Sequence, residues 1–176
     1  MENLEIVNGY CNGLEGAYYY NVEIPNTANI ISDGAFYRDN IGKVTLSDSI
    51  VEIGFWAFAG NKLREIIIPN SVKVLGFGAF AWNQLKKIKL SENITVIGRA
   101  AFSENQLEIV EIPNNVLKIG WRAFYKNKIK ELVIPESVKY IDSESFVKNM
   151  LTQVYVPVHT KIHPEAFDKN VEIIRY

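Results

Sequence analysis

The segment spanning residues 54–75 changes its pattern of apolar and polar positions along its length. In its middle part, Leu63, Ile66 and Ile68 are apolar and Glu65 is polar. Such near-alternation predicts a short strand with one buried face. The first eight residues of the segment, GFWAFAGN, are too few for a regular helix and predict a short 3₁₀ or helical turn.

This pattern recurs along the chain with a period of 22 residues, shortened to 21 in the last copy. One phenylalanine marks each copy: Phe36, Phe58, Phe80, Phe102, Phe124, Phe146 and Phe167. Three positions later stands a column of asparagines, with an aspartate in the first copy: Asp39, Asn61, Asn83, Asn105, Asn127, Asn149 and Asn170. A repeat this short cannot bury its own apolar face, so each copy is expected to form one coil of a stacked solenoid.

The predicted fold is therefore mainly β, with a parallel ladder sheet and short 3₁₀ or helical turns at the Ala-Phe motifs. The strand columns hold in the other copies, as in Leu85, Ile88 and Leu90. Prolines follow several of these strands, where they turn the chain without removing a ladder hydrogen bond. The asparagine column is interpreted as a structural ladder that satisfies backbone groups at the bends of its own and the adjacent coil.

Residues 1–23 do not form a full repeat and are predicted to be an N-terminal β-hairpin cap with a lead-in strand. Asn8-Gly9 is a strong two-residue hairpin signal, and Cys11 is expected to be a small apolar residue of the cap. Residues 24–176 are expected to form the seven-coil solenoid, in one structural domain overall, with residues 171–176 as a closing strand.

Charge and composition remove several classes of function. Nineteen Lys and Arg against twenty Asp and Glu leave a formal net charge of -1, so nothing favours a nucleic-acid partner. The single cysteine permits neither an intramolecular disulfide nor a cysteine zinc site. No apolar run approaches the roughly 18 residues that span a bilayer, so no membrane insertion is expected. The first residues do not have the pattern of a secretory signal peptide.

Candidates for catalysis or cofactor binding are few. His159 and His163 have the i, i+4 spacing of metal ligands on a helix, but Pro157 and Pro164 flank them and no third ligand is close in sequence. The glycines are spread one to a coil rather than gathered in a phosphate-binding loop. We therefore expect no catalytic residues, no cofactor and no metal, and an enzyme is not expected.

The repeat IPNSVKVLGFGAFAWNQLKKIKL resembles the BspA-type leucine-rich repeat, and the resemblance covers essentially the whole chain. The resemblance implies a curved leucine-rich-repeat solenoid with a protein-binding or adhesive role, and partners among host or cell-surface proteins. It brings no catalytic residues. Location stays open: cytoplasmic if the chain is complete, secreted or at a cell surface if it is a processed or excised fragment.

Two surfaces compete as the binding site. On the ladder strands, opposite charges adjoin in successive coils, as in Lys89 and Glu111, and are interpreted as solubilising pairs. Around the Ala-Phe turns, aromatic residues occupy outward columns, and either pack between coils or anchor a partner. The predicted protein-binding residues are Phe55, Trp56, Phe77, Trp82, Trp121 and Tyr125.

The sequence thus predicts a non-enzymatic module for adhesion or recognition that binds another protein. The alternative is a structural or self-associating solenoid without a dedicated external ligand. Dependence of size in solution on concentration separates the two.

Overall fold

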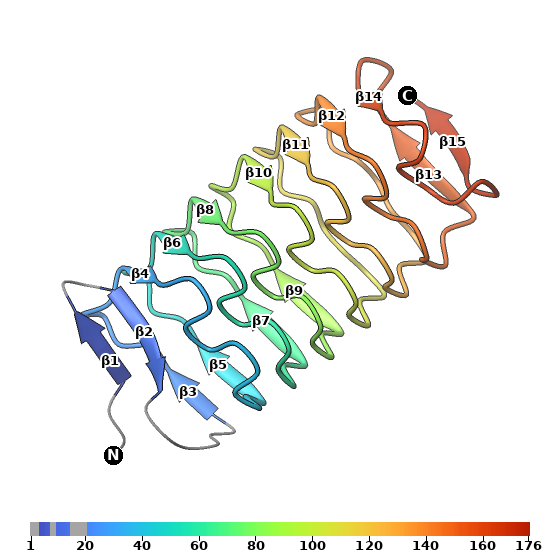
Figure 1. Cartoon of the computed structure of the whole chain (residues 1–176). Coiled ribbons are helices and arrows are strands. Elements are labelled where there is room, and N and C mark those ends of the chain that lie inside the picture. The colour runs from blue at the N-terminus through green and yellow to red at the C-terminus, as the bar shows by residue number, and fades with distance from the viewer. Residues whose placement is uncertain (1–3, 8–9, 15–20) are drawn as a thin grey trace.

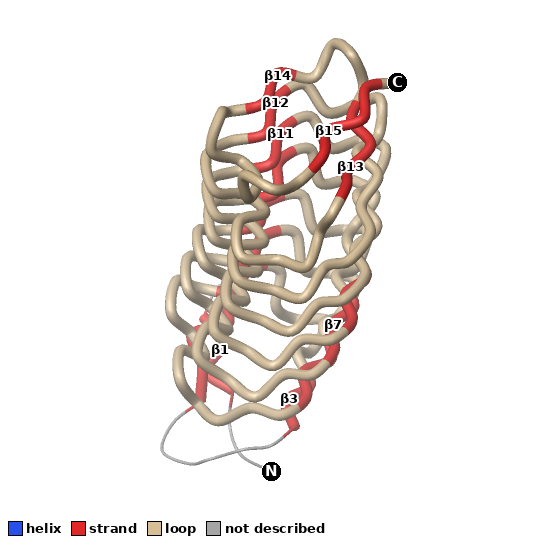
Figure 2. Tube along the Cα trace, turned by 90° about the vertical axis from the view of Figure 1, so that its right-hand side faces the viewer, coloured by secondary structure: helices blue, strands red, loops and turns tan. Residues whose placement is uncertain are grey.

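The computed structural model describes residues 4–7, 10–14 and 21–176, with side chains from residue 21 onward. The coils stack in sequence order into an elongated solenoid, and the N-terminal and C-terminal ends lie at its opposite ends (Figure 1; Figure 2). Within the described ranges every regular element is a strand and none is a helix. The mainly β solenoid predicted from the repeat is confirmed.

Along one side of the stack runs a set of two-residue strands that begins with a hairpin (Figure 1). The hairpin pairs β1 with β2 in antiparallel fashion, and β2 then pairs parallel with β4. The Asn8-Gly9 turn and the side chain of Cys11 lie outside the described residues, and the domain boundary at residue 23 stays a prediction. The strands on this side are β1 (Leu4–Val7), β2 (Tyr10–Leu14), β4 (Ile30–Ile31), β6 (Glu52–Ile53), β8 (Val74–Leu75), β10 (Val96–Ile97), β11 (Lys118–Ile119), β12 (Tyr140–Ile141) and β14 (Lys161–Ile162).

The predicted ladder strands run along the other side of the stack (Figure 1). All pairs are parallel. The β3–β5 and β7–β9 pairs join residues 22 positions apart, as Val22 joins Val44, so these coils lie in register, whereas β13 and β15 pair 19 positions apart, as Val154 joins Ile173. Residues 109 and 131, and residues 133 and 155, form isolated bridges rather than strands. The strands are β3 (Asn21–Glu23), β5 (Lys43–Thr45), β7 (Glu65–Ile67), β9 (Lys87–Lys89), β13 (Gln153–Val156) and β15 (Glu172–Arg175).

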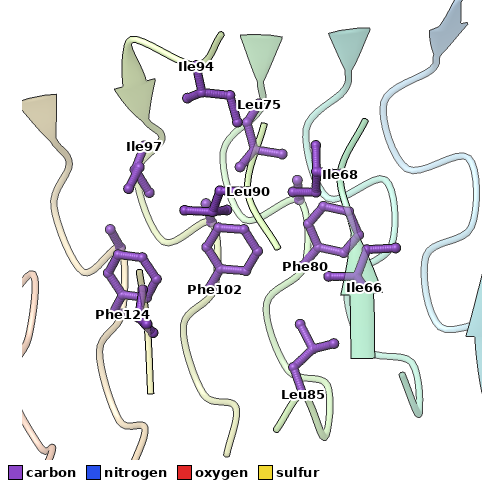
Figure 3. Close-up of a cluster of buried hydrophobic side chains, with 14 of the residues drawn as sticks. Ile66, Ile68, Leu75, Phe80, Leu85, Leu90, Ile94, Ile97, Phe102 and Phe124 are labelled. Atoms are coloured by element: carbon purple, nitrogen blue, oxygen red, sulfur yellow. The ribbon is translucent and has the colours of Figure 1, made fainter. Parts of the chain in front are cut away.

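The repeated phenylalanines form one continuous stack through the core. Neighbouring rings are nearly parallel, with centroids 5.0 Å apart for Phe36 and Phe58 and 5.7 Å apart for Phe80 and Phe102. Figure 3 shows Phe80, Phe102 and Phe124 in successive coils, surrounded by the buried Leu and Ile side chains of the strands. No coil has a core of its own, so the burial of these columns between neighbouring coils holds the stack together.

The asparagine column is an internal ladder, as predicted. The Asn105 amide nitrogen donates to the carbonyls of Phe80 and Phe102 at 2.9 and 3.2 Å, and its oxygen accepts from the Leu85 amide at 3.0 Å. Each such side chain therefore satisfies backbone groups in two coils, as Asn61, Asn83, Asn127 and Asn149 also do. Asn170 is exposed and does not join the ladder.

The Ala-Phe segments are successive hydrogen-bonded turns rather than pieces of helix. In residues 54–57 the Ala57 amide donates to the Gly54 carbonyl at 3.4 Å, and Trp56 at the third position has a φ of 58°. A left-handed residue at that position is typical of a type II turn and prevents helical continuation. The equivalent residue also has a positive φ in five other coils: Gly34, Gly78, Ala100, Arg122 and Glu144.

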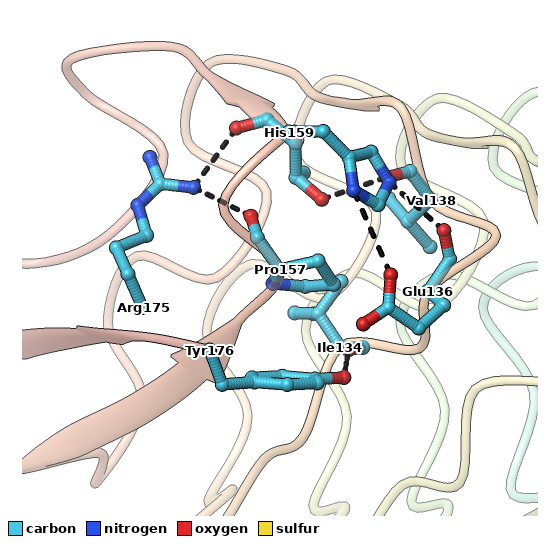
Figure 4. A network of polar contacts seen from close by, with 8 residues as sticks. Ile134, Glu136, Val138, Pro157, His159, Arg175 and Tyr176 are labelled. Atoms are coloured by element: carbon cyan, nitrogen blue, oxygen red, sulfur yellow. Dashed lines mark hydrogen bonds and ion pairs between the residues drawn. The ribbon is translucent and has the colours of Figure 1, made fainter.

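At the C-terminal end, β15 pairs parallel with β13, so the predicted closing strand is present. The Arg175 guanidinium donates to the carbonyls of Pro157 and Thr160, both at 2.9 Å, and the Tyr176 hydroxyl donates to the Ile134 carbonyl at 2.7 Å (Figure 4). These bonds attach the last strand to two earlier coils.

Candidate functional site

The turns present a defined outer surface because the coils are bonded to one another along them. Trp56, Phe58 and Gly60 donate their amides to the carbonyls of Phe77, Ala79 and Ala81 in the next coil, at 2.8–2.9 Å. The Ala57 and Phe58 side chains of this turn are buried in the core, whereas columns such as those of Phe55 and Trp82 point outward. We call the outward side chains of these turns, within residues 32–39 and the equivalent segments of later coils, the turn face.

Four of the six predicted binding residues lie on neighbouring coils of the turn face, and three of them touch. Trp56 stacks on Trp82 with ring centroids 4.9 Å apart and an angle of 16° between the planes. Phe77 meets Trp56 edge-on at 4.6 Å. Gly78 permits this packing, because a Cβ there would lie 2.7 Å from the Trp56 ring. Phe55 is 55% exposed and Trp82 is 41% exposed, whereas Trp56 and Phe77 are half-buried.

The other two predicted residues, Trp121 and Tyr125, form a second cluster that arginines connect to the first. The Arg99 guanidinium carbon lies 5.9 Å from the centroid of Phe77 and 5.4 Å from that of Trp121. Arg122 lies 4.5 Å from Trp121 and 4.7 Å from the Tyr125 centroid. The structure thus brings the six residues into one strip of rings and cations, while their role in binding stays a prediction.

Beside the first cluster the turn face is hollowed. The hollow has a volume of about 510 Å³ and is lined by Asp33, Gly34, Tyr37, Phe55, Trp56 and Trp82. Gly34 shares the column of Trp56, and no atom lies within 4 Å of the place where its Cβ would be, which leaves open space in this column. An apolar recess with polar groups at its rim is the usual form of a binding site.

Two carboxylates hold the backbone and the ring that border this hollow. Asp33 Oδ1 accepts a hydrogen bond from the Phe55 amide at 2.6 Å. Glu104 accepts from Trp82 Nε1 at 3.2 Å and from Lys126 Nζ at 2.7 Å. The hydrogen bond from Lys126 holds the pKa of Glu104 below its usual value; partial burial opposes this effect, and the bond from Trp82 adds to it.

Three residues beside this strip were missing from the predicted set: Asp33, Tyr37 and Arg99. Their columns could have identified them. Asp33 and Arg99 share the column of Phe55 and Phe77, and Tyr37 shares that of Tyr125. Columns tell which residues face outward together, but not which side chains meet.

The outward side chains of the ladder strands, here called the ladder face, also have hollows. The larger, of about 820 Å³, lies between β9 and residues 108–114, with Lys86, Lys87 and Lys89 on one side and Glu108 and Glu111 on the other. The second, of about 530 Å³, lies between residues 110–114 and 131–136 and reaches Tyr176. The predicted pairing of Lys89 with Glu111 is wrong, since no ion pair joins them within the described residues. The two side chains lie on facing walls of the larger hollow instead.

The histidines have local structural contacts. One ring nitrogen of His159 lies 2.9 Å from the Glu136 carbonyl, and the other lies 3.6 Å from the Glu136 carboxylate (Figure 4). His163 Nδ1 accepts from the Glu165 amide at 3.2 Å. The part of the chain that the structure describes contains no group of three or more His, Cys, Asp or Glu side chains placed to hold a metal ion.

No membrane-spanning helix was found in the described ranges.

Comparison with known proteins places the repeat in a family. The model of the BspA type leucine-rich repeat region matches residues 15–128 and 57–174, with six copies. No curated protein sequence matches the chain.

Several solved structures are similar at low sequence identity. A leucine rich cell surface protein of Faecalibacterium prausnitzii is 19% identical, with a TM-score of 0.49 over 87% of this chain and 59% of its own. A leucine-rich repeat protein of Bacteroides ovatus is 18% identical, with a TM-score of 0.44 over 88% of this chain and 51% of its own. The pneumococcal vaccine antigen PcpA is 19% identical, with a TM-score of 0.38 over 89% of this chain and 67% of its own. The chain thus spans little more than half the length of the first two.

Proposed function

The chain belongs to the BspA-type leucine-rich repeat family, and we propose that it is a non-enzymatic recognition module that binds another protein through its turn face. The observation that supports this is the aromatic hollow of about 510 Å³ with exposed Phe55 and Trp82 at its border. By family resemblance the partner is a host or cell-surface protein.

The energetics of interfaces favour such a surface. Aromatic anchors in a desolvated pocket commonly contribute about 2 kcal/mol or more each, whereas charges at a rim contribute little. The Trp56 ring is already fixed by Trp82 and Phe77, so little side-chain freedom remains to be lost there on binding. Three backbone hydrogen bonds join the coil of Trp56 to the coil of Phe77, which keeps the rings in place.

The ladder face is the competing surface. Its larger hollow carries lysines and glutamates on facing walls, so a partner must replace the hydration of both signs of charge. The turn face has more aromatic area, which is desolvated at lower cost. This difference is why the turn face is preferred.

Partner capture by variants tests the proposal. A Phe55→Ser/Trp82→Ser double variant should lose capture of immobilised host-matrix and cell-surface proteins while its melting temperature stays near that of the wild type. These positions suit the test because both side chains are exposed, whereas Phe77 is half-buried; the melting temperature is measured beside capture because Trp82 also stacks on Trp56.

A Lys87→Ser/Lys89→Ser variant is the matched control on the ladder face and should retain capture. Loss of capture in this variant alone would move the site to the ladder face. Light scattering over a range of concentrations completes the test. Growth in size with concentration that the Phe55/Trp82 variant abolishes, without any captured partner, would favour the self-associating alternative.

A further inference from the structure

We propose that the hollow at Tyr37, Phe55, Trp56 and Trp82 receives an arginine side chain of the partner. This inference rests on the proposed function and assigns the chemistry of one contact within it. The guanidinium would lie against the exposed rings beside the Asp33 carboxylate.

The chain's own packing on the turn face provides the first argument. Rings further along this face are already covered by cations of the same chain. Arg99 lies over Phe77 and Trp121, and Arg122 over Trp121 and Tyr125, with distances of 4.5–5.9 Å. A guanidinium is attracted to the negative face of such a ring, and the attraction grows as water is excluded.

The hollow differs from this arrangement. Within the described residues no cation of the chain lies over the rings of Phe55, Trp56 or Trp82. The Tyr37 ring differs, because the Arg38 guanidinium carbon lies 5.1 Å from its centroid. Phe55, Trp56 and Trp82 therefore provide aromatic rings around the hollow without a cation of the chain over them.

Charge provides the second argument. Asp33 borders the hollow and is exposed, and its Oδ1 is held by the Phe55 amide. Its Oδ2 has no protein partner in the described part of the chain. A carboxylate fixed beside aromatic faces favours a cation over a neutral apolar side chain.

Between the two basic side chains, arginine is the better match. A planar guanidinium can stack on a ring and still donate to a carboxylate at its edge, which a compact ammonium cannot do at once. The chain itself follows this preference, since arginines contribute five of its seven cation–ring contacts in the described residues.

A titration with short peptides tests the inference without knowledge of the partner. The probes are capped Gly-Arg-Gly and its citrulline counterpart, which keeps the shape and removes the charge. Binding is followed through the indole N–H signals of the three tryptophans in ¹H–¹⁵N NMR spectra. We expect the arginine peptide to shift the signals of Trp56 and Trp82 and to leave Trp121 unchanged. The citrulline peptide should bind about three- to ten-fold more weakly.

An isosteric variant separates charge from shape. Asp33→Asn keeps an acceptor for the Phe55 amide and should weaken the arginine peptide about three-fold or more, with no effect on the citrulline peptide. Asp48→Asn, which removes an exposed carboxylate that does not line the hollow, is the control and should change neither. Equal affinities of the two peptides, or shifts centred on Trp121, would overturn the inference.

The outcomes of this titration and of partner capture are independent. If the Phe55/Trp82 variant loses capture but the arginine and citrulline peptides bind alike, the proposed function is supported and the arginine contact is excluded. If the arginine peptide binds at the hollow but capture is unaffected by the variant, the recess binds guanidinium and the proposed function falls.

Discussion

The turn side and the two strand-bearing sides of the solenoid join neighbouring coils in different ways. At every interface from residue 34 to residue 147, three amides of one turn donate to carbonyls of the next. The last interface keeps this number, because the Lys148 amide donates to the Asp168 carboxylate where the final coil is one residue short. The turn side is thus bonded continuously along its length.

Both strand-bearing sides are interrupted. Among the described residues, no backbone hydrogen bond joins residues 86–90 with residues 108–112, and none pairs β5 with β7 or β8 with β10. The first of these gaps contains the hollow of about 820 Å³. There Ile88 is half-buried, whereas Ile66 in the same column is 2% exposed.

This comparison identifies the part of the repeat that keeps the coils in register. The phenylalanine stack and the asparagine ladder both lie under the turns, where bonding is complete. The strands supply buried apolar surface, but their hydrogen bonds can be lost locally without ending the stack.

Removal of a stacked ring should have the largest effect. Phe102→Ala should lower the free energy of unfolding by about 3–5 kcal/mol, because a fully buried ring leaves a cavity between two others. Phe55→Ala on the turn face should cost about 1 kcal/mol or less. Urea denaturation measures both, and similar losses would mean that outward rings are part of the core.

The gap in the ladder is tested by one substitution in adjacent coils. Ile66→Ala should cost about 2–4 kcal/mol, and Ile88→Ala about half as much, because Ile88 is already partly solvated. Chemical denaturation of the two variants gives the difference. Equal costs would show that the ladder is as tightly packed at β9 as at β7.

The asparagine ladder gives an intermediate effect. Asn105→Ala should lower the free energy of unfolding by about 1–3 kcal/mol, since it removes the acceptor of the buried Leu85 amide and one of the two asparagine donors to each of the carbonyls of Phe80 and Phe102. Asn114→Ala, at an exposed position, should change it by about 0.5 kcal/mol or less. A mild effect at Asn105 would contradict a role of the ladder in stability.

The smallest effect concerns backbone conformation on the turn side. Ala100 has a φ of 51° and Ala101 beside it is not left-handed, while both are buried. Glycine adopts positive φ at little cost, so Ala100→Gly should be about 1 kcal/mol less destabilising than Ala101→Gly. Thermal unfolding of the pair measures this difference, and the reverse order would exclude strain at the turn.

Much of this architecture could be predicted because it depends on the same residue type recurring at a fixed spacing. Phe80 and Asn83 recur with their equivalents every 22 residues, and stacking places equivalents in contact. The same reasoning identified Phe55 and Trp82 as outward residues. A repeat pattern, however, predicts the same contacts at every interface between neighbouring coils.

The features that differ between coils could not be predicted in this way. The gap beside β9 separates Lys89 from Glu111 although their positions in the repeat adjoin. Arg99 interrupts a column of rings in the sequence, yet in three dimensions it connects Phe77 with Trp121. Such contacts depend on side-chain rotamers and local spacing, which a one-dimensional repeat does not contain.

The forward donation of amides along the turns gives this edge of the molecule an electrical polarity. Each peptide group carries a dipole of about 3.5 D, and groups aligned head to tail add, as in an α-helix. Here the N–H groups of Phe36, Phe58, Phe80, Phe102, Phe124 and Phe146 all point toward the C-terminal coils. A coil therefore has a donor side and an acceptor side along this edge. A reversed coil would set donors against donors, so only units of one orientation can extend the stack.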